Sequence, residues 1–191
     1  VNYDVIPPIP PSGLSPLVEG VPPLFVAYKE WSKAAITGGQ PQRPVDAFSQ
    51  KVLPAIRERK VNVASRREWP ADVLLSVHKS LVEATPKWLL SQALWFASAT
   101  AGDWVEKSRT FSQSVATMSI VGHVLGLGDR HLDNIMIDYS AGEVVHIDYN
   151  VCLDRGLRLR IPERIPFRLT QNIVSALGFT GVEGVFRSTC R

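Results

Sequence analysis

The spacing of apolar residues along the chain predicts a mostly helical protein. In several stretches, apolar side chains recur every three or four positions, which is the period of a helix with one buried face. Such helices are expected over residues 46–59, 70–81, 86–95, 103–125 and 169–177, with a further helix beginning near residue 184. Local signals support these limits, because Asp46 can cap a helix start, proline suits a first turn and Gly126 favours a helix end.

Two short runs rich in β-branched residues interrupt this helical pattern. Residues 135–137 and 144–147 are β-prone, and a short polar segment separates them. Such a pair of runs indicates a β-hairpin. The predicted fold class is therefore mainly α, of the α+β type, with one hairpin among the helices.

The first 23 residues differ from the rest because they contain seven of the 14 prolines. Proline lacks a backbone donor and favours extended or polyproline conformation, so this stretch is expected to be a linker or a strap over a surface. A proline-rich ligand for an aromatic groove is the functional alternative. A second break is expected at residues 37–41, which are rich in glycine and proline.

Composition places the chain among ordinary globular proteins. Apolar residues make up 45% and charged residues 20% of its 191 positions, which is enough to build a buried core. The net charge of +3 comes without a block of like charges, so no direct nucleic-acid partner is predicted. The longest mostly apolar run, residues 115–127, is too short to cross a bilayer, so no membrane partner is expected.

The two cysteines, Cys152 and Cys190, form neither a CxxC pair nor a disulfide framework. Their number and spacing fit a reducing compartment. No basic segment followed by an apolar stretch opens the sequence, so no signal peptide is expected. We therefore expect a soluble protein of the cytoplasm, the nucleus or both.

Polar residues gather between the long helix and the hairpin, from Gly126 to Asn134. Polar side chains flanked by buried elements are costly unless they bind something. Asp129 precedes Asn134 by five positions, and Asp148 follows Asn134 by fourteen. A protein-kinase catalytic site has this spacing, with the second aspartate holding metal. Asn134 and Asp148 offer the oxygen ligands that Mg²⁺ prefers, and Asp129 would accept or orient the proton of a substrate hydroxyl.

Each residue of this loop also has a structural interpretation. Asp129 could cap the loop, Asn134 could satisfy backbone groups at the strand entry, and His131 could be a hydrogen-bonded structural histidine. As a site residue, His131 would instead offset the negative charge of the transferring phosphoryl group. The role of Arg130 is undecided between a structural ion pair and a contact with phosphate. Asp133 is expected to be solvated.

The histidines do not indicate a zinc site. A set made of His123, His131, His146 and Cys152 has no recognised ligand spacing. His123 falls on the long helix and His146 in a strand. Both are therefore expected in or near the core.

Residues 126–134 read Gly-Leu-Gly-Asp-Arg-His-Leu-Asp-Asn, residues 145–148 read Val-His-Ile-Asp, and residues 165–170 read Ile-Pro-Phe-Arg-Leu-Thr. These segments resemble the catalytic loop, the metal loop and the end of the activation loop of the phosphatidylinositol 3-kinase-related protein kinases. Residues 149–152 and 180–187 further resemble the branch of that family that acts in nonsense-mediated mRNA decay.

The resemblance implies a role for each matching position. The implied site residues are the catalytic Asp129 and its partner His131, the Mg²⁺ ligands Asn134 and Asp148, and Met136 and Ile147 at the adenine pocket. The implied cofactors are ATP and Mg²⁺, with Mn²⁺ as an alternative metal.

The resemblance also implies a domain layout. Residues 1–45 would be a proline-rich segment that leaves the hinge, followed by a linker. Residues 46–191 would be the core of a kinase C-lobe, truncated at its C-terminal end. The catalytic loop (126–134), the metal loop (146–150) and the activation segment (149–170) would lie within this core.

A complete kinase also needs a glycine-rich loop and a lysine on a strand. The sequence contains no GxGxxG, and Val26-Ala27-Tyr28-Lys29 copies the V-A-I-K signature only superficially, because a proline-rich stretch precedes it. The N-lobe is therefore expected to be missing, and the chain is expected to be inactive alone.

The function implied is that of a serine/threonine protein kinase, which transfers the γ-phosphoryl group of ATP to Ser or Thr followed by Gln. The expected partners are a protein substrate, an RNA helicase in mRNA surveillance, and the rest of the kinase chain, its N-lobe and helical scaffold. A lipid kinase of the same superfamily is the alternative. The five arginines between residues 152 and 168 are interrupted by Asp154 and Glu163, which favours a protein substrate. A non-catalytic interaction module is the third possibility.

Overall fold

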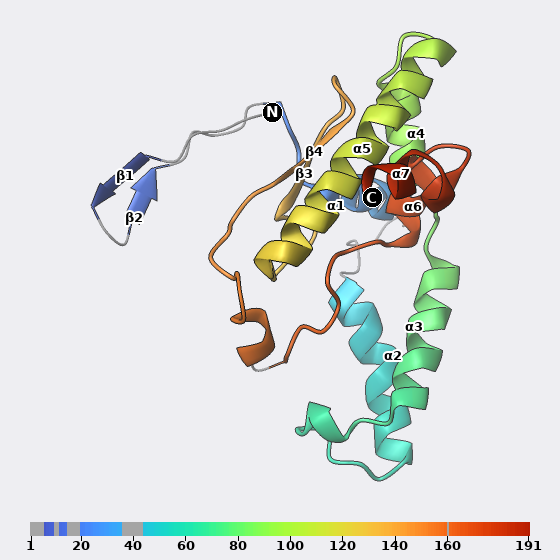
Figure 1. Cartoon of the computed structure of the whole chain (residues 1–191). Coiled ribbons are helices and arrows are strands. Elements are labelled where there is room, and N and C mark those ends of the chain that lie inside the picture. The colour runs from blue at the N-terminus through green and yellow to red at the C-terminus, as the bar shows by residue number, and fades with distance from the viewer. Residues whose placement is uncertain (1–5, 10–11, 15–19, 36–43, 160) are drawn as a thin grey trace. The chain divides into compact units, whose positions relative to one another are not determined.

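The computed structural model describes residues 6–9, 12–14, 20–35, 44–159 and 161–191 (Figure 1). Its helices are α1 (Leu24–Ala35), α2 (Pro44–Glu58), α3 (Ala71–Ala84), α4 (Leu89–Phe96), α5 (Ala101–Leu125), α6 (Gln171–Ala176) and α7 (Val185–Thr189). Its strands are β1 (Ile6–Ile9), β2 (Ser12–Leu14), β3 (Ile135–Asp138) and β4 (Glu143–His146). Short 3₁₀ turns cover Arg66–Glu68, Gly156–Arg158 and Gly181–Glu183. The predicted mainly helical α+β class is confirmed.

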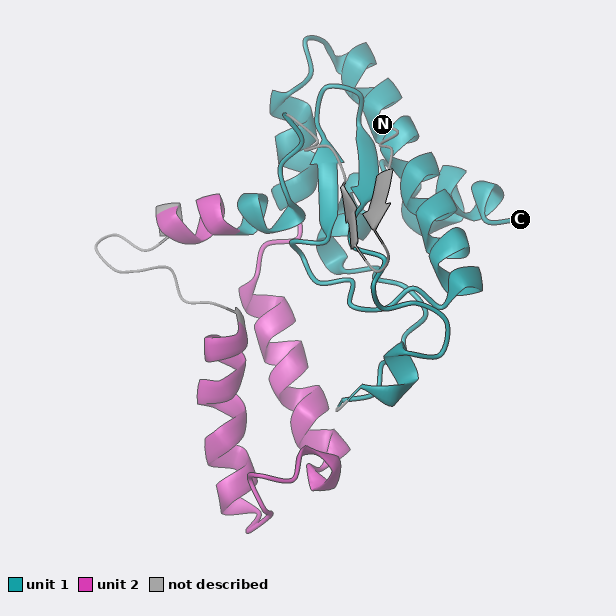
Figure 2. Ribbon diagram, turned by 90° about the vertical axis from the view of Figure 1, so that its left-hand side faces the viewer, with its two compact units in different colours: residues 1–28, 88–191 teal, residues 29–87 magenta. Residues whose placement is uncertain are grey.

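The chain forms two compact units, which Figure 2 colours separately. Unit 1 comprises residues 1–28 and 88–191, and unit 2 comprises residues 29–87. Unit 1 carries the loops predicted to hold the chemistry. The predicted boundary between residues 45 and 46 stays a prediction, and the break predicted at residues 37–41 lies outside the described residues.

The core of unit 1 is built around α5 and the hairpin β3–β4, which pack against one another (Figure 1). The strands pair antiparallel, with Ile135 opposite His146. Ile135 and Ile137 are buried in the core, and Met136 lies on the other face of β3, because successive side chains of a strand point to opposite faces. Helices α4 to α7 complete this core with Leu90, Leu94, Phe111, Val115, Ala116, Ile173, Ala176, Leu177 and Phe186.

The two ends of α5, the longest helix, are fixed by local sequence. At its start, Thr100 Oγ1 accepts a hydrogen bond from the Asp103 N–H at 3.1 Å, and Asp103 Oδ2 accepts one from the Ala99 N–H at 2.9 Å. At its end, Gly126 has a φ of +60°, the left-handed conformation that favours glycine. A Cβ at Gly126 would lie 2.3 Å from the carbonyl oxygen of Leu153. The catalytic loop therefore begins at a sharply defined point.

Removal of the cap at Thr100 tests the start of this helix. The variant Thr100→Ala is expected to lower the free energy of unfolding by about 1 kcal/mol, because the Asp103 N–H loses its acceptor. Thr117→Ala, at an exposed position inside the same helix, is the control and is expected to change that free energy by less than about 0.5 kcal/mol. Urea denaturation followed by circular dichroism measures both, and equal losses would contradict the capping role.

The segment before α1 lies along the edge of β3. The Ile137 N–H donates to the Pro22 carbonyl at 2.9 Å, Pro23 forms a β-bridge with Met136, and the Phe25 N–H donates to the Leu132 carbonyl at 3.2 Å. Residues 22–25 thereby join the catalytic loop and the hairpin into one backbone network.

Several details of the N-terminal half differ from the prediction. The stretch expected to be extended contains a second hairpin, in which Ile6 pairs with Leu14 and Ile9 with Ser12. Helix α1 was not predicted. Helix α4 begins at Leu89 rather than at Pro86.

His123 also differs from the prediction. It is exposed on α5 rather than in or near the core. His146, by contrast, is half-buried as predicted, in β4.

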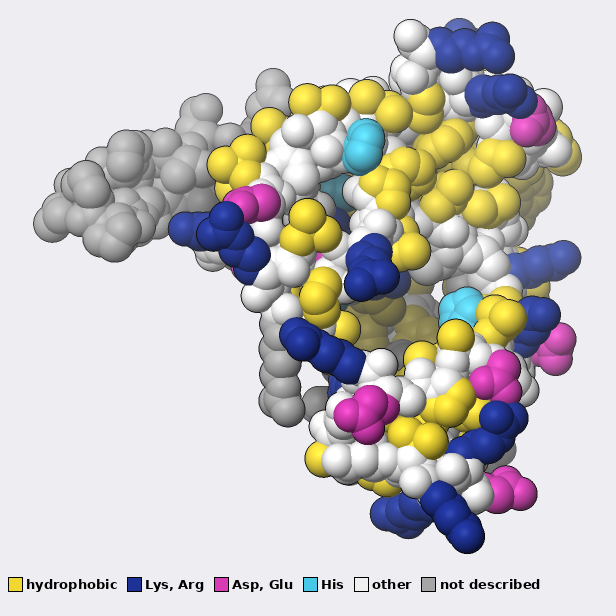
Figure 3. Space-filling view, turned by 60° about the horizontal axis from the view of Figure 1, so that its bottom comes forward, with side chains coloured by type: hydrophobic (Ala, Val, Ile, Leu, Met, Phe, Trp, Pro, Cys, Tyr) yellow, Lys and Arg dark blue, Asp and Glu magenta, His cyan; other side chains and the backbone are white. Residues whose placement is uncertain are grey.

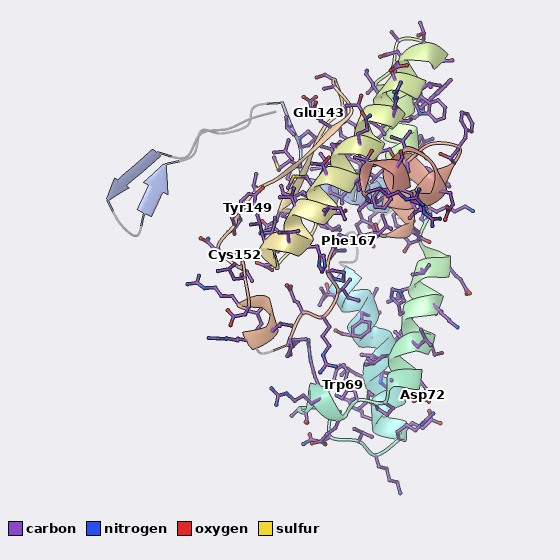
Figure 4. The ribbon with its side chains drawn as sticks, viewed as in Figure 1. Trp69, Asp72, Glu143, Tyr149, Cys152 and Phe167 are labelled. Atoms are coloured by element: carbon purple, nitrogen blue, oxygen red, sulfur yellow. The ribbon has the colours of Figure 1, made fainter. Side chains whose placement is uncertain are left out.

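Unit 2 is a pair of packed helices with a small core of its own. Val52 and Ile56 of α2 pack against Val73 and Val77 of α3. Arg59 Nη2 also lies 2.7 Å from Asp72 Oδ2 (Figure 4 labels Asp72), which is an exposed ion pair of little energetic weight. Unit 2 therefore holds together through its apolar seam.

The charged side chains on one side of the described part of the chain are mixed in sign. On the side drawn in Figure 3, Lys and Arg side chains are interspersed with Asp and Glu rather than gathered in one block. Within the described ranges, no helix combines the length and apolar character needed to span a membrane.

Candidate active site

The loop between α5 and β3 is tied by backbone hydrogen bonds to the segment that follows β4. The Gly128 N–H donates to the Val151 carbonyl at 2.8 Å, and the Leu153 N–H donates to the Leu125 carbonyl at 2.7 Å. The segment carrying Tyr149 and Cys152 accordingly runs beside the C-terminal end of α5 (Figure 4). This pairing brings the predicted catalytic loop and the predicted metal loop together.

The two predicted site aspartates share an unusual backbone conformation. Asp129 has a φ of +56° and Asp148 a φ of +57°, in the left-handed region that non-glycine residues seldom occupy. Such conformations cost free energy and persist only where the surroundings enforce them. Their presence at both predicted positions is a feature that active sites commonly show.

Arg130 supplies much of that enforcement. Its Nε donates to the Gly128 carbonyl at 2.8 Å, its Nη1 to the Ile147 carbonyl at 2.7 Å, and its Nη2 to the Asp148 carbonyl. Burial lowers the pKa of Arg130, but a guanidinium keeps its charge in proteins. These hydrogen bonds support a structural role for Arg130 as a clamp between the two loops, and its contact with phosphate stays untested.

Asn134 is buried at the base of the loop, with 6% of its surface exposed. Its side-chain Nδ2 donates to the Asp129 backbone carbonyl at 2.9 Å. Its backbone carbonyl accepts a hydrogen bond from the Ile147 N–H at 3.1 Å. Because Nδ2 is engaged with Asp129, the side-chain oxygen Oδ1 is the atom suited to a cation. Asn134 therefore combines a backbone-satisfying role with a possible ligand atom.

His131 is held in one tautomer by its neighbour. Its Nδ1 accepts a hydrogen bond from the Asp133 N–H at 3.2 Å, so the neutral ring carries its proton on Nε2. That Nε2 lies 4.0 Å from Asp129 Oδ2. The side chains of His131 and Asp129 are both about half-exposed. Asp133 itself is exposed, as predicted.

Asp148 stands exposed at the exit from β4. Its Oδ1 accepts a hydrogen bond from the Asn150 N–H at 3.1 Å, which stabilises the turn that follows. The neighbouring Tyr149 is also exposed, and its ring centroid lies 6.0 Å from Arg130 Cζ, a cation–π contact. One oxygen of the Asp148 carboxylate, Oδ1, is thus held by a hydrogen bond, while the residue as a whole is exposed.

The residues expected to line an adenine pocket occupy neighbouring positions of the hairpin. Met136 is half-buried on the face of β3 opposite to the core residues, and Pro23 pairs with it. Ile147 is half-buried directly after β4, where its N–H donates to Asn134. Both therefore lie close in the chain fold to Asn134, which pairs with Ile147, and their contact with a nucleotide stays a prediction.

The donor set suits magnesium rather than zinc. Among the residues that the structure describes, no group of three or more His, Cys, Asp and Glu side chains could hold a metal ion. Mg²⁺ needs only one or two protein oxygens beside water and phosphate ligands, and Asn134 Oδ1 with the Asp148 carboxylate supplies that chemistry. The residues present therefore fit the predicted metal.

Two residues that contact the catalytic loop, Glu163 and Arg168, were not predicted as part of the site. Both carboxylate oxygens of Glu163 accept the Asp129 N–H, at 3.1 and 2.9 Å. Arg168 Nε similarly donates to the Arg130 carbonyl at 2.6 Å. No pattern in the sequence signals these contacts, because they join residues 34 and 38 positions apart.

A small cavity of about 20 Å³ lies behind the loop rather than at its open side. Its lining is mostly apolar, with Arg130, Arg168 and His146 among the lining residues. Burial, with the charge of Arg130, lowers the pKa of His146 to about 4, so this imidazole is neutral at physiological pH. The cavity has room for about one water molecule and is too small for a nucleotide.

Comparisons with known proteins agree with the resemblance to kinases seen in the sequence. The family model described as phosphatidylinositol 3- and 4-kinase matches residues 1–191. The chain is 44% identical over 200 residues to the serine/threonine-protein kinase Smg1 of Drosophila melanogaster and 49% identical over 148 residues to a probable kinase smg1 of Dictyostelium discoideum, covering 99% and 77% of this chain. It spans only 6% of the length of each of these relatives.

Solved structures agree. The chain superposes on the structure described as a Tel1 kinase butterfly symmetric dimer with a TM-score of 0.77 and 32% identity, covering 100% of this chain and 7% of that one. The structure described as the FAT and kinase domain of CtTel1 matches with a TM-score of 0.71 and 31% identity, covering 93% of this chain and 12% of that one.

Proposed function

The chain belongs to the phosphatidylinositol 3- and 4-kinase family, and we propose that it carries the catalytic loop and metal loop of a serine/threonine protein kinase. One observation carries the proposal above the others. The spaced residues Asp129, Asn134 and Asp148 lie on two loops that Arg130 and two backbone hydrogen bonds hold together. The longer kinase chain would transfer the γ-phosphoryl group of ATP to a protein hydroxyl.

The residues of the loop have distinct tasks in this proposal. Asp129 accepts or orients the proton of the substrate hydroxyl. The Nε2–H of His131 would offset negative charge on the phosphoryl group. Asn134 Oδ1 and the Asp148 carboxylate hold Mg²⁺ or Mn²⁺, which when bound neutralises charge on the phosphates of ATP. Met136 and Ile147 contact the adenine.

A protein substrate is favoured over a lipid by the charges of the activation segment. Arg155 donates to the Asn150 carbonyl at 3.0 Å, and Arg158 pairs with Asp154. A site for inositol phosphates would need several uncommitted cations. The relatives named above are serine/threonine kinases, which supports the same choice.

The finer assignments follow from the resemblance to the branch that acts in nonsense-mediated mRNA decay. We propose that the substrate is an RNA helicase, phosphorylated at Ser or Thr followed by Gln, in the cytoplasm, the nucleus or both. The partners within the enzyme would be an N-lobe and a helical scaffold of the longer chain, because the curated relatives are far longer than this one.

A direct comparison of substrates tests the proposal. The full-length kinase is expected to phosphorylate a Ser-Gln peptide at least about tenfold faster than phosphoinositide vesicles, since Arg155 and Arg158 of its activation segment are engaged within the segment itself. Incorporation of radioactive phosphate from ATP with Mg²⁺ measures both rates. The matched peptide with Ala in place of Ser is the control. Preferential labelling of the vesicles would overturn the protein-kinase assignment.

A further inference from the structure

Glu163 links the activation segment to the backbone of Asp129. Its two carboxylate oxygens lie 3.1 and 2.9 Å from the Asp129 nitrogen, and both accept that N–H. The two residues are 34 positions apart, so the bond closes a long loop of chain. Asp129 also has one of the strained backbone conformations of the site, with a φ of +56°.

The space around this carboxylate is closely fitted. A Cβ built at Gly128 would lie 2.3 Å from Glu163 Oε2, and one built at Gly156 would lie 3.3 Å from the same atom. The Glu163 N–H in turn donates to the Gly156 carbonyl at 3.0 Å. Two glycines therefore leave room for the glutamate, one in the catalytic loop and one in the activation segment.

Two arginines, Arg130 and Arg168, place positive charge near the Glu163 carboxylate. The carboxylate interacts electrostatically with Arg130 and Arg168, and in each case it opposes the lowering of the arginine pKa that burial causes. Arg168 also donates to the Arg130 carbonyl at 2.6 Å. The contact is thus part of a network that joins the C-terminal part of the activation segment to the catalytic loop.

We propose that Glu163 is a positioning residue through which the activation segment holds the catalytic loop in its working conformation. This inference rests on the proposed kinase function. The bond to Glu163 fixes the direction of the Asp129 N–H, and with it the strained φ that orients the Asp129 side chain. An activation segment that moves away removes this acceptor, so Asp129 is positioned for catalysis only while the segment is folded onto the loop.

Two substitutions in the full-length kinase separate positioning from charge. Glu163→Ala removes the acceptor and is expected to lower kcat for peptide phosphorylation by about 10- to 100-fold, with the KM for ATP changed less than about threefold. Glu163→Gln keeps an accepting oxygen and is expected to retain kcat within about threefold of wild type. Glu183→Ala, at an exposed glutamate beside α7, is the matched control and leaves both constants unchanged.

Amide hydrogen exchange gives a readout that does not require activity. Exchange at residues 126–131 is expected to accelerate in Glu163→Ala and to stay near the wild-type rate in Glu163→Gln and Glu183→Ala. Unchanged exchange and kcat in Glu163→Ala, or a loss in Glu163→Gln as large as in Glu163→Ala, would overturn the positioning role. If the wild-type kinase transfers no phosphate, the proposed function is wrong. The exchange experiment does not depend on activity, so it still decides whether Glu163 holds the loop.

Discussion

Replacement of Asp148 by asparagine is expected to lower phosphoryl transfer by the full-length kinase about 1,000-fold or more. Loss of a metal-ligand charge removes several kcal/mol of transition-state stabilisation, and each 1.36 kcal/mol is a factor of ten in rate. Asparagine suits this position structurally, because it tolerates the φ of +57° and its oxygen can still accept the Asn150 N–H. The substitution therefore changes the charge while leaving the turn in place.

Asp46→Asn, on the exposed surface of α2, is the matched control, since it removes the same charge far from the proposed site in sequence. The kinase rate is measured over a range of Mg²⁺ concentrations, together with a thermal melt. We expect unchanged melting of both variants and loss of activity only in Asp148→Asn. Near-normal activity of Asp148→Asn at all Mg²⁺ concentrations would exclude Asp148 as a metal ligand.

The helices that carry the site were predictable because their signals are local. The apolar spacing of α5 predicts one buried face, and Gly126 predicts where it ends. The left-handed φ of Gly126 and the lack of space for a side chain there explain why that signal is reliable. The same holds for the hairpin, whose strands are defined by adjacent β-prone runs.

The start of α4 shows where local signals fail. A proline predicted the start at Pro86, but the helix begins at Leu89, whose N–H donates to Asn172 Oδ1 at 3.0 Å. This cap comes from α6, at the other end of the sequence. Tertiary contact therefore decides the helix boundary, and no window around Pro86 contains that information.

Some residues of the site could likewise be predicted from local sequence, and others could not. The spacing of Asp129, Asn134 and Asp148 in the sequence was enough to nominate them, because kinase chemistry demands those residue types in that order. Arg130 and Glu163 act instead on backbone carbonyls and on a backbone N–H. Every residue except proline has both a backbone N–H and a carbonyl. The sequence therefore does not indicate which side chain will bind to a given backbone group. Only the fold identifies which arginine and which glutamate support the loop.

Arg130→Lys is expected to lower both the stability of the protein and its rate of phosphoryl transfer. The guanidinium of Arg130 reaches the carbonyls of Gly128, Ile147 and Asp148 at once, whereas a lysine ammonium cannot match this planar fork. We expect a loss of about 2 kcal/mol in the free energy of unfolding, because carbonyls in the half-buried loop lose a charged donor. We also expect kcat to fall about 100-fold, because Asp148 loses the contact that fixes its backbone.

Arg109→Lys is the control for this prediction, since it makes the same change at an exposed position of α5. It should leave both stability and kcat near their wild-type values. Because the Arg130 guanidinium donates to backbone carbonyls of the two loops, Arg130→Lys should lower kcat without altering which peptide is preferred. A variant that melts normally but discriminates peptides or nucleotides differently would instead place the Arg130 side chain in direct contact with substrate, contrary to the clamp inferred from its hydrogen bonds.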